Sequence, residues 1–365
     1  MKINILIPYK EKFDENKASS VSITVKNNLV HSSYLNQIKV FGRNVKTPFF
    51  MDNFIGLKYS ILSFRGKNKF LAHEMLKIIA KDSNKNQLIE IHNRPYLVNQ
   101  IAKGNKFPIS LFFHNDPQTM KGSKLIKDRE NILEKCAIIF CVSEFIKKKF
   151  LEGINKDFQK VCVLYNGVER KLKKFPKKKK EILFVGRLVP EKGVHLFVDG
   201  VKAIAHKYPE WSFDLIGSYK LGDNKNRNFY ADEMIKKFMN IGPQAQFYGF
   251  KNQEFVEEKM KSASIVIIPS VWEEPFGLVA AEAMSSGACI IASKVGGIPE
   301  IIKDNGVLIE NINYKKLSLK IQNLIEDKKM RQYYQKKAWK NFEFFSKNSS
   351  NMLDTFRKTI YSNYY

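Results

Sequence analysis

The chain lacks the cysteine pattern of a disulfide framework or a zinc site. Its cysteines, Cys136, Cys141, Cys162 and Cys289, form no C-x-x-C pair, and no nearby histidines complete a metal-binding pattern. Unpaired cysteines in apolar runs are typical of reduced core positions in a cytosolic protein. We therefore predict a cytoplasmic protein whose stability comes from apolar cores, which its 44% hydrophobic residues can supply.

Long apolar runs are also missing. No stretch approaches the ~18 apolar residues that a membrane-spanning helix needs. The first residues, MKINILIPYK, carry too short an apolar run for a signal peptide. We predict no transmembrane segment, while peripheral attachment to the inner face of the cytoplasmic membrane stays open.

Acidic residues are few relative to basic ones. The 365 residues include 62 lysines and arginines against 36 aspartates and glutamates, a formal net charge of +26. Such an excess favours an anionic partner, which is nucleic acid, an anionic membrane or a phosphorylated substrate. The alternative is a compositional bias that only decorates the surface, because the charge is spread through both halves of the chain.

Three common site motifs are absent. The chain has no Asp-x-Asp, so a metal-anchored nucleotide-sugar site is not expected; His73-Glu74 lacks the second histidine of a zinc protease, and IGSYKLGD lacks the Gly-Lys-Ser/Thr of a P-loop. We predict neither a metal nor a cofactor. His92, Asn93 and Arg94 follow an apolar strand, where they either line a cleft or form a structural turn.

Short apolar runs, in contrast, alternate with helical patterns along the whole chain. Near-continuous apolar strands between helices are typical of parallel sheets covered on both faces. Two such series in tandem predict two Rossmann-like, doubly wound α/β domains. The first series is KINILIP, QIKVFG, LIEIHN, PISLFFH, AIIFCVS and VCVLYNG, and the second is EILFVGR, SFDLIG, AQFYGF, SIVIIPS, ACIIASK and GVLIE.

The domain boundary is predicted at Asn166-Gly167, where a strand ends in a turn signal. It separates a first domain over residues 1–166 from a second over residues 167–345. The run ERKLKKFPKKKK after the boundary is interpreted as a solvated connector, with a contact to anionic lipid as the alternative. The tail is helical in pattern, with a predicted break at SKNSSN.

The stretch PSVWEEPFGLVAAEAMSSG predicts a phosphate site. A buried strand ends just before it, and Gly277 opens a helix after Phe276. The first amides of this helix, near Gly277, Leu278 and Val279, have no partners inside the helix and lie at the positive end of its dipole. Such a helix start binds phosphate at the carboxyl end of a parallel strand.

Two glutamates of the same stretch flank this helix start. Glu274 precedes the helix and Glu282 lies a little over one turn inside it, so both can reach one ligand. Carboxylates accept hydrogen bonds from sugar hydroxyls. A phosphate between two hydroxyl-binding acids indicates a nucleotide sugar; the alternative is a glutamate that only stabilises the helix dipole.

The motif GRLVPEKG adds two cations. Arg187 and Lys192 lie in the loop after the first strand of the second domain, and Gly186 permits a tight turn there. A guanidinium fork and an ammonium five residues apart can converge on a diphosphate. Together with the helix amides they predict a diphosphate site that needs no metal.

These motifs resemble the retaining glycosyltransferases of family four, which have the GT-B fold. The likeness covers most of residues 160–310; in the first half only the strand order, FFHNDP and YNGV resemble the family. It implies that Arg187, Lys192 and the helix amides bind the donor diphosphate. It also implies that Glu282 binds the ribose and Glu274 the donor sugar.

The resemblance extends to further positions. Phe250 is implied to border the base, and His114 matches a first-domain histidine that faces the reacting sugar. The family's Gly-Gly loop after the first strand is missing, because the first glycine here is Gly42; Ser19 and Ser20 replace it, and Ser20 is predicted to cap the next helix. The implied catalytic residues are His114 and Glu274, and the substrate-binding residues are Gly186, Arg187, Lys192, Phe250, Phe276, Gly277, Leu278, Val279, Glu282, Ser19 and Ser20.

The implied function is metal-independent transfer of a hexose-type sugar, with retention, from a UDP- or GDP-linked donor to an acceptor hydroxyl. The acceptor is a glycan or lipid-linked molecule of envelope glycan, lipopolysaccharide or glycolipid synthesis, and residues 346–365 pack back on the acceptor-side first domain.

Two alternatives stay open. One is a GT-B nucleotide-sugar epimerase or phosphorylase; the other is a nucleic-acid-binding protein, which only the charge suggests. Because the chain has no recognised nucleic-acid module, we predict no nucleic-acid partner.

Overall fold

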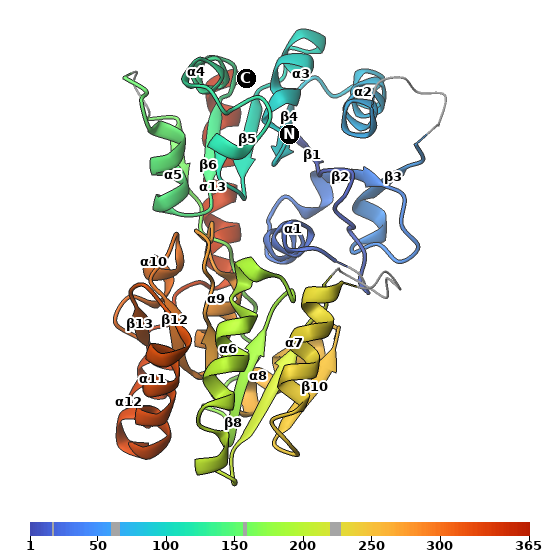
Figure 1. Ribbon diagram of the computed structural model, residues 1–365. Helices are drawn as coiled ribbons and strands as arrows, with labels where there is room; N and C mark the ends of the chain where they lie inside the picture. Colours follow the sequence, from blue (N-terminus) through green and yellow to red (C-terminus); the bar gives the residue numbers. More distant parts are fainter. Residues whose placement is uncertain (17, 60–65, 156–158, 220–227) are drawn as a thin grey trace. The chain divides into compact units, whose positions relative to one another are not determined.

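The computed structural model describes residues 1–16, 18–59, 66–155, 159–219 and 228–365. The chain forms two compact units. Unit 1 contains Met1–Gly167 and Phe344–Tyr365, and unit 2 contains Val168–Glu343. Each unit has one sheet of parallel strands with helices packed around it (Figure 1).

Unit 1 holds a seven-stranded sheet in the order β3-β2-β1-β4-β5-β6-β7. Its strands are β1 (Lys2–Leu6), β2 (Ile38–Arg43), β3 (Phe54–Leu57), β4 (Gln87–His92), β5 (Ile109–Phe113), β6 (Ile138–Cys141) and β7 (Val161–Val163). Its α-helices are α1 (Ser20–Val30), α2 (Lys67–Ala80), α3 (Val98–Gly104), α4 (Ile126–Lys135), α5 (Glu144–Leu151) and α13 (Ser346–Tyr364). Short 3-10 helices are η1 (Leu35–Gln37), η2 (Met51–Asn53), η3 (Pro95–Leu97) and η4 (Pro117–Thr119).

Unit 2 holds a six-stranded sheet in the order β10-β9-β8-β11-β12-β13. Its strands are β8 (Lys179–Val185), β9 (Ser212–Ile216), β10 (Ala245–Gly249), β11 (Ala263–Ile268), β12 (Cys289–Ser293) and β13 (Val307–Ile309). Its α-helices are α6 (Val194–Lys202), α7 (Phe229–Met239), α8 (Gln253–Ser262), α9 (Leu278–Ser285), α10 (Ile298–Ile302), α11 (Tyr314–Glu326) and α12 (Lys328–Lys340). Its 3-10 helices are η5 (Pro190–Lys192) and η6 (Ala205–Lys207).

The predicted fold class is confirmed, because each unit is a doubly wound parallel sheet. All six predicted strands of the second series are present, whereas β3 of unit 1 was not predicted. The four residues of β3 are only half-buried and include Gly56, so they lack the continuous apolar run that marks the inner strands.

The order of strands reverses once in each sheet, between β1 and β4 in unit 1 and between β8 and β11 in unit 2. Neighbouring strands at such a reversal send their following helices to opposite faces. The loops after them separate and leave room for a ligand at the carboxyl ends of the strands. The two reversals therefore define where a site is expected in each unit.

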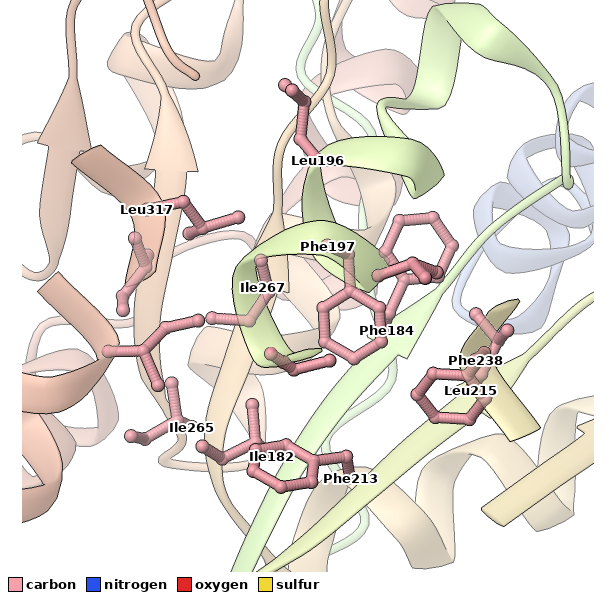
Figure 2. Close-up of a cluster of buried hydrophobic side chains, with 14 of the residues drawn as sticks. Ile182, Phe184, Leu196, Phe197, Phe213, Leu215, Phe238, Ile265, Ile267 and Leu317 are labelled. Carbon is pink, nitrogen blue, oxygen red and sulfur yellow. The ribbon is translucent and has the colours of Figure 1, made fainter. Parts of the chain in front are cut away.

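The core of unit 2 is apolar. Phe184 of β8, Phe213 of β9 and Ile267 of β11 pack against Phe197 of α6 and Leu317 of α11 (Figure 2). All five side chains are at most 2% exposed. This packing fixes β8 and β11 beside one another, which holds the loops at their carboxyl ends in place.

Unit 1 is fastened instead by a buried ionic network on α13. Arg357, which is 1% exposed, donates two hydrogen bonds of 2.8 Å to the carboxylate of Glu90 on β4. It also donates to Asp354 at 3.0 Å, and Asp354 accepts a 2.7 Å hydrogen bond from the Ser33 N–H. One positive and two negative charges, all of them hydrogen-bonded, thus attach α13 to β4 and to the end of α1.

The predicted helix break at SKNSSN is wrong, since α13 begins at Ser346 and runs through these residues. Small side chains let α13 lie close to α1, and their hydroxyls find acceptors there. Ser349 Oγ donates to the Tyr165 carbonyl at 2.7 Å, and Ser350 Oγ donates to the Asn28 carbonyl at 2.8 Å. The serines for which we predicted a helix break therefore pack inside unit 1.

Candidate active site

Two loops meet at the strand reversal of unit 2. The Val271 N–H after β11 donates to the Glu191 carbonyl after β8 at 3.0 Å. Gly193 has φ +66°, and a Cβ there would lie 1.8 Å from the Pro269 carbonyl oxygen. Only glycine permits this approach, so the two loops that carry the predicted site are held together by backbone contacts.

An ion pair lies between these loops. The Lys192 Nζ and Glu274 Oε1 atoms are 2.5 Å apart, and the Ser270 hydroxyl donates to the same carboxylate oxygen at 2.7 Å. Glu274 is only 7% exposed, so its charge depends on these two partners. Two residues that were predicted separately, one for a diphosphate and one for a sugar, are in direct contact.

The predicted helix start follows at once. Gly277 is the N-cap of α9 with φ +103°, and Phe276 before it is buried. Ala280 and Ala281 donate to the Gly277 carbonyl, so the N–H groups of Leu278 and Val279 precede the hydrogen-bond ladder of the helix. These amides are available to an anion at the carboxyl end of β11.

The backbone of the loop that carries Glu274 contacts a second glycine turn, at Gly296-Gly297. The Gly297 N–H donates to the Glu274 carbonyl at 2.7 Å, and a Cβ on Gly296 would lie 2.3 Å from that oxygen. Sequence reasoning gave these glycines no role, nor Ser270. The pair of adjacent glycines, Gly296-Gly297, was the available signal, because neighbouring glycines often mark a close backbone approach.

The other predicted residues of the β8 loop are more open. Arg187 is exposed, and its side chain contacts no charged or hydrogen-bonding group among the described residues. The Gly186 N–H donates to the Ile216 carbonyl at 3.1 Å, and a Cβ on Gly217 would meet the Gly186 carbonyl oxygen at 1.8 Å. The loop is thus packed tightly on β9, while the exposed Arg187 guanidinium is not engaged by the residues that the structure describes.

Glu282 faces a different surface from Glu274. It lines a pocket with Gln253, Val256 and Glu257 of α8. Burial, reinforced by the carboxylate of Glu257, raises the pKa of Glu282 to about 7. Phe250 lies directly after β10, on the approach to α8, and is partly buried. The structure therefore separates the two predicted acids onto two sides of the α9 start.

A half-buried lysine holds α9 and α8 at their far ends. Lys178 Nζ donates to the carbonyls of Met260 and Lys261 at the end of α8 and to the Ser286 carbonyl at the end of α9. A cation at a helix C-terminus is favourable because of the helix dipole. The interpretation of the lysine run as a solvated connector is therefore wrong for Lys178. Lys179 and Lys180 belong to β8 rather than to a connector, although their side chains are exposed as predicted.

At the strand reversal of unit 1, two histidines are paired. His92 at the end of β4 and His114 just after β5 approach with His92 Nδ1 and His114 Nε2 2.8 Å apart. Burial lowers the pKa of His114 to about 4 and the pKa of His92 well below its ordinary value. Both imidazoles are therefore neutral at physiological pH.

Ser19, at the loop after β1, donates its hydroxyl to the carboxylate of Glu11. The prediction that Ser20 caps the helix is wrong, because Ser20 is the first residue of α1 and Ser19 occupies the N-cap position. Burial raises the pKa of Glu11, and the nearby Arg94 opposes this rise. The loop therefore places polar side chains, rather than the predicted small spacer alone, at the carboxyl end of β1.

Among the described residues, no group of three or more His, Cys, Asp or Glu side chains is arranged to hold a metal ion. Over the same residues, no helix is long and apolar enough to cross a membrane.

The comparison with protein families agrees with the geometry of unit 2. Residues 167–341 match the family described as Glycosyl transferases group 1. Unit 2 is therefore similar to the group 1 glycosyltransferases over nearly all of its residues. The match begins at the start of unit 2 and includes both loops of the ion pair and the whole of α9.

Relatives of known sequence cover part of the chain. An uncharacterized glycosyltransferase of Methanocaldococcus jannaschii, MJ1178, is 34% identical over 214 residues, which are 58% of this chain and 55% of that protein. The lipopolysaccharide 1,2-N-acetylglucosaminetransferase of Salmonella typhimurium is 26% identical over 186 residues, which are 47% of this chain and 49% of that protein. The chain thus spans about half the length of these two relatives.

Solved structures extend the likeness to both units. The crystal structure of Anabaena Alr3699/HepE in complex with UDP and glucose matches with a TM-score of 0.76 at 17% identity, over 98% of this chain and 100% of that one. At this identity the likeness concerns the fold, and it confirms the predicted GT-B class of two doubly wound α/β domains.

Proposed function

We propose that this protein is a retaining glycosyltransferase that transfers a hexose-type sugar from a nucleoside-diphosphate sugar to an acceptor hydroxyl. The observation that carries the proposal is the Lys192–Glu274 ion pair beside the free amides of α9, at the strand reversal of unit 2. It places a cation, helix amides and a buried carboxylate around one position. This combination of groups suits a diphosphate joined to a sugar.

The donor is held in three parts. Arg187, Lys192 and the amides of Leu278 and Val279 bind the diphosphate. Glu282 accepts hydrogen bonds from the ribose in its pocket against α8, with Phe250 near the base. Glu274 accepts from the transferred sugar, and Lys192 then moves from Glu274 to the diphosphate.

Catalysis is mainly electrostatic in this proposal. The bond between the anomeric carbon and the diphosphate oxygen breaks, and its electron pair stays on the diphosphate, where Arg187, Lys192 and the helix amides stabilise the added charge. The acceptor oxygen forms the new bond on the same face of the sugar. Its proton passes to an oxygen of the departing phosphate, so no protein nucleophile is required.

Two comparisons support the choice of substrates. The Anabaena structure contains UDP and glucose, which favours a UDP-linked hexose as the donor. The Salmonella relative is named for transfer within lipopolysaccharide, which favours a glycan or lipid-linked acceptor of the cell envelope. The acceptor side of the reaction is assigned to unit 1, with His114 facing the reacting sugar and Ser19 and Ser20 in the loop after β1.

A surface of unit 1 fits an anionic membrane. Leu125 and Ile126, at the start of α4, are 67% and 46% exposed. The exposed Lys121, Lys124 and Lys127 flank them, and no acidic side chain among the described residues pairs with Lys124 or Lys127. Apolar side chains enter the headgroup region while each lysine contributes about 1 kcal/mol on anionic lipid. We assign peripheral membrane attachment to this surface.

Vesicle sedimentation tests the attachment. The protein should sediment with vesicles of phosphatidylcholine containing one third phosphatidylglycerol and not with phosphatidylcholine alone. Replacing Leu125 and Ile126 by Gln should release it. The control Leu319→Gln, which changes a 56% exposed leucine on α11 of unit 2, should not. Equal binding by both variants would contradict the assignment.

A melting-temperature screen followed by product analysis tests the transfer itself. A ligand that binds only the folded protein raises its melting temperature, so one of UDP, GDP or their sugars should stabilise the chain while AMP does not. With that donor and a glycan acceptor, the product should keep the anomeric configuration of the donor. Conversion of the donor without any acceptor would instead indicate an epimerase.

A further inference from the structure

His92 is a buried titratable group that the transfer step does not use. It is 2% exposed, and its ring stacks on Phe112 with the ring centroids 4.3 Å apart. The only hydrogen-bonding contact of its ring among the described residues joins His92 Nδ1 to His114 Nε2 at 2.8 Å, and the other nitrogen, Nε2, is buried without a partner in that part of the chain.

The partners of the two rings decide where the proton lies. Two neutral imidazoles share one hydrogen bond, so one nitrogen of the contact carries the proton and the other accepts it. If His114 donated, His92 would carry its own proton on Nε2, a buried N–H without an acceptor. A buried N–H left unpaired is rarer and costlier than an unused acceptor lone pair. His92 Nδ1–H therefore donates to His114 Nε2.

Backbone hydrogen bonds fix the two strand ends that carry these rings. Asn93, with φ +56°, donates its N–H to the Phe112 carbonyl at 2.8 Å, and its side-chain oxygen accepts from the His114 N–H at 3.1 Å. The ends of β4 and β5 are thus fixed to each other on both sides of the pair. Burial lowers the pKa of His92, and the neighbouring His114 and the cation Arg357 lower it further, so His92 does not gain a second proton at physiological pH.

We propose that His92 is a positioning residue that fixes His114 as the Nδ1–H tautomer. With its Nε2 occupied, the partly exposed His114 presents a hydrogen-bond donor at Nδ1 and no acceptor. A donor at this place suits a hydroxyl or ring oxygen of a sugar. It is unsuited to removing a proton, which agrees with the leaving phosphate as the base. This last role rests on the proposed function; the tautomer itself does not.

Long-range proton–nitrogen NMR spectra of the full-length ¹⁵N-labelled protein test the proposal directly. The chain has 6 histidines, and the His114 signals are identified by their loss in His114→Gln. At pH 7.5 the spectrum should show His114 protonated on Nδ1 and His92 also protonated on Nδ1. A His114 ring protonated on Nε2 would overturn the proposal.

Two substitutions of His92 separate orientation from packing. His92→Phe keeps the stacking on Phe112 and removes the donor, so His114 should change to the Nε2–H tautomer or a mixture. His92→Asn keeps an amide donor near the position of Nδ1 and should preserve the tautomer of His114. An unchanged His114 tautomer in a folded His92→Phe protein would contradict the proposal, and the Asn variant provides the comparison if the Phe variant does not fold.

The transfer assay adds a second readout. His92→Phe should lower kcat about tenfold, the effect of one misdirected hydrogen bond, while the KM for the donor changes little; His92→Asn should recover most of kcat. If NMR shows the expected tautomers but no donor sugar is transferred, the proposed function fails and the histidine pair stands. If transfer occurs and the tautomer differs, only the role of His92 fails.

Discussion

The two strand reversals share one topology and differ in their electrostatics. In unit 2 the reversal carries a lysine, a buried glutamate and free helix amides, all of which respond to charge. In unit 1 it carries two histidines that burial keeps neutral. In the proposed function the same fold element serves two tasks: the site in unit 2 stabilises charge that develops on a leaving group, and the site in unit 1 orients neutral hydroxyls.

The two units also differ in what holds them together. Unit 2 relies on a large apolar core around β8 and β11, whereas unit 1 attaches its last helix through the buried Arg357–Glu90–Asp354 network. Removing one member of a buried ionic network leaves its partners uncompensated. Changes in the polar network should therefore act on unit 1 alone.

Arg357→Ala is expected to have the largest effect on stability. Breaking a buried ion pair from one side costs about 3–5 kcal/mol, because Glu90 keeps its charge without a partner. Hydrogen exchange at increasing urea concentration should show loss of protection in α13, β4 and α1, with α6 and β11 unchanged. Lys303→Ala, which breaks the exposed pair with Glu343, should have little effect. A uniform loss of protection over both units would contradict the separation.

Lys192→Ala should have the largest effect on catalysis. Deleting one preorganised donor near the developing charge costs about 2–4 kcal/mol of transition-state stabilisation. Initial rates should therefore fall about 30- to 1000-fold, and Arg187→Ala should behave similarly. Lys294→Ala, which removes an exposed lysine paired with Glu310 in the same unit, is the matched control. Near-normal turnover in Lys192→Ala would mean that the donor lies elsewhere.

Glu282 should make stability depend on pH. Its pKa is raised to about 7 in the folded chain, so the folded state binds more protons than the unfolded state between about pH 4.5 and pH 7. The stability that this protonation provides is present below pH 4.5 and is lost as pH rises to 7. Glu282→Gln should therefore be more stable than the parent above pH 7, by roughly 1–3 kcal/mol.

Melting curves of the two proteins between pH 4.5 and pH 8 provide the measurement. Glu257→Gln is the control, because removing the neighbouring carboxylate should shift the transition of Glu282 to lower pH without abolishing it. Parallel curves for the parent and Glu282→Gln would show that Glu282 ionises normally.

Removal of metal ions by a chelator should have the smallest effect on the rate of sugar transfer. The arrangement assigns the neutralisation of the diphosphate to Arg187, Lys192 and the helix amides, so transfer in excess EDTA should proceed at the untreated rate. Loss of activity that is restored by manganese or magnesium would show that cations of the protein alone are insufficient.

The sequence predicts more of the site in unit 2 than of the site in unit 1. Glu274, Gly277 and Lys192 lie in local motifs, so their chemistry could be inferred from spacing, although the ion pair between Lys192 and Glu274 could not. The His92–His114 contact depends on β4 lying beside β5, which no local pattern specifies. The hydrogen bonds from Lys178 to backbone carbonyls could not be predicted for a similar reason. A lysine in a basic run is expected to be solvated until the carbonyls beside it are known.

The central claim is that Glu274 and Glu282 divide one donor between sugar and ribose. Calorimetry with bare UDP or GDP, whichever stabilises the protein, tests it most directly. Glu282→Gln should weaken binding of the bare nucleotide by about 1.5–3 kcal/mol, the loss of hydrogen bonds to a charged group. Glu274→Gln should leave this affinity unchanged or increase it, because Lys192 is released from its ion pair, while sugar transfer falls. Equal weakening of bare-nucleotide binding by both substitutions would contradict the account.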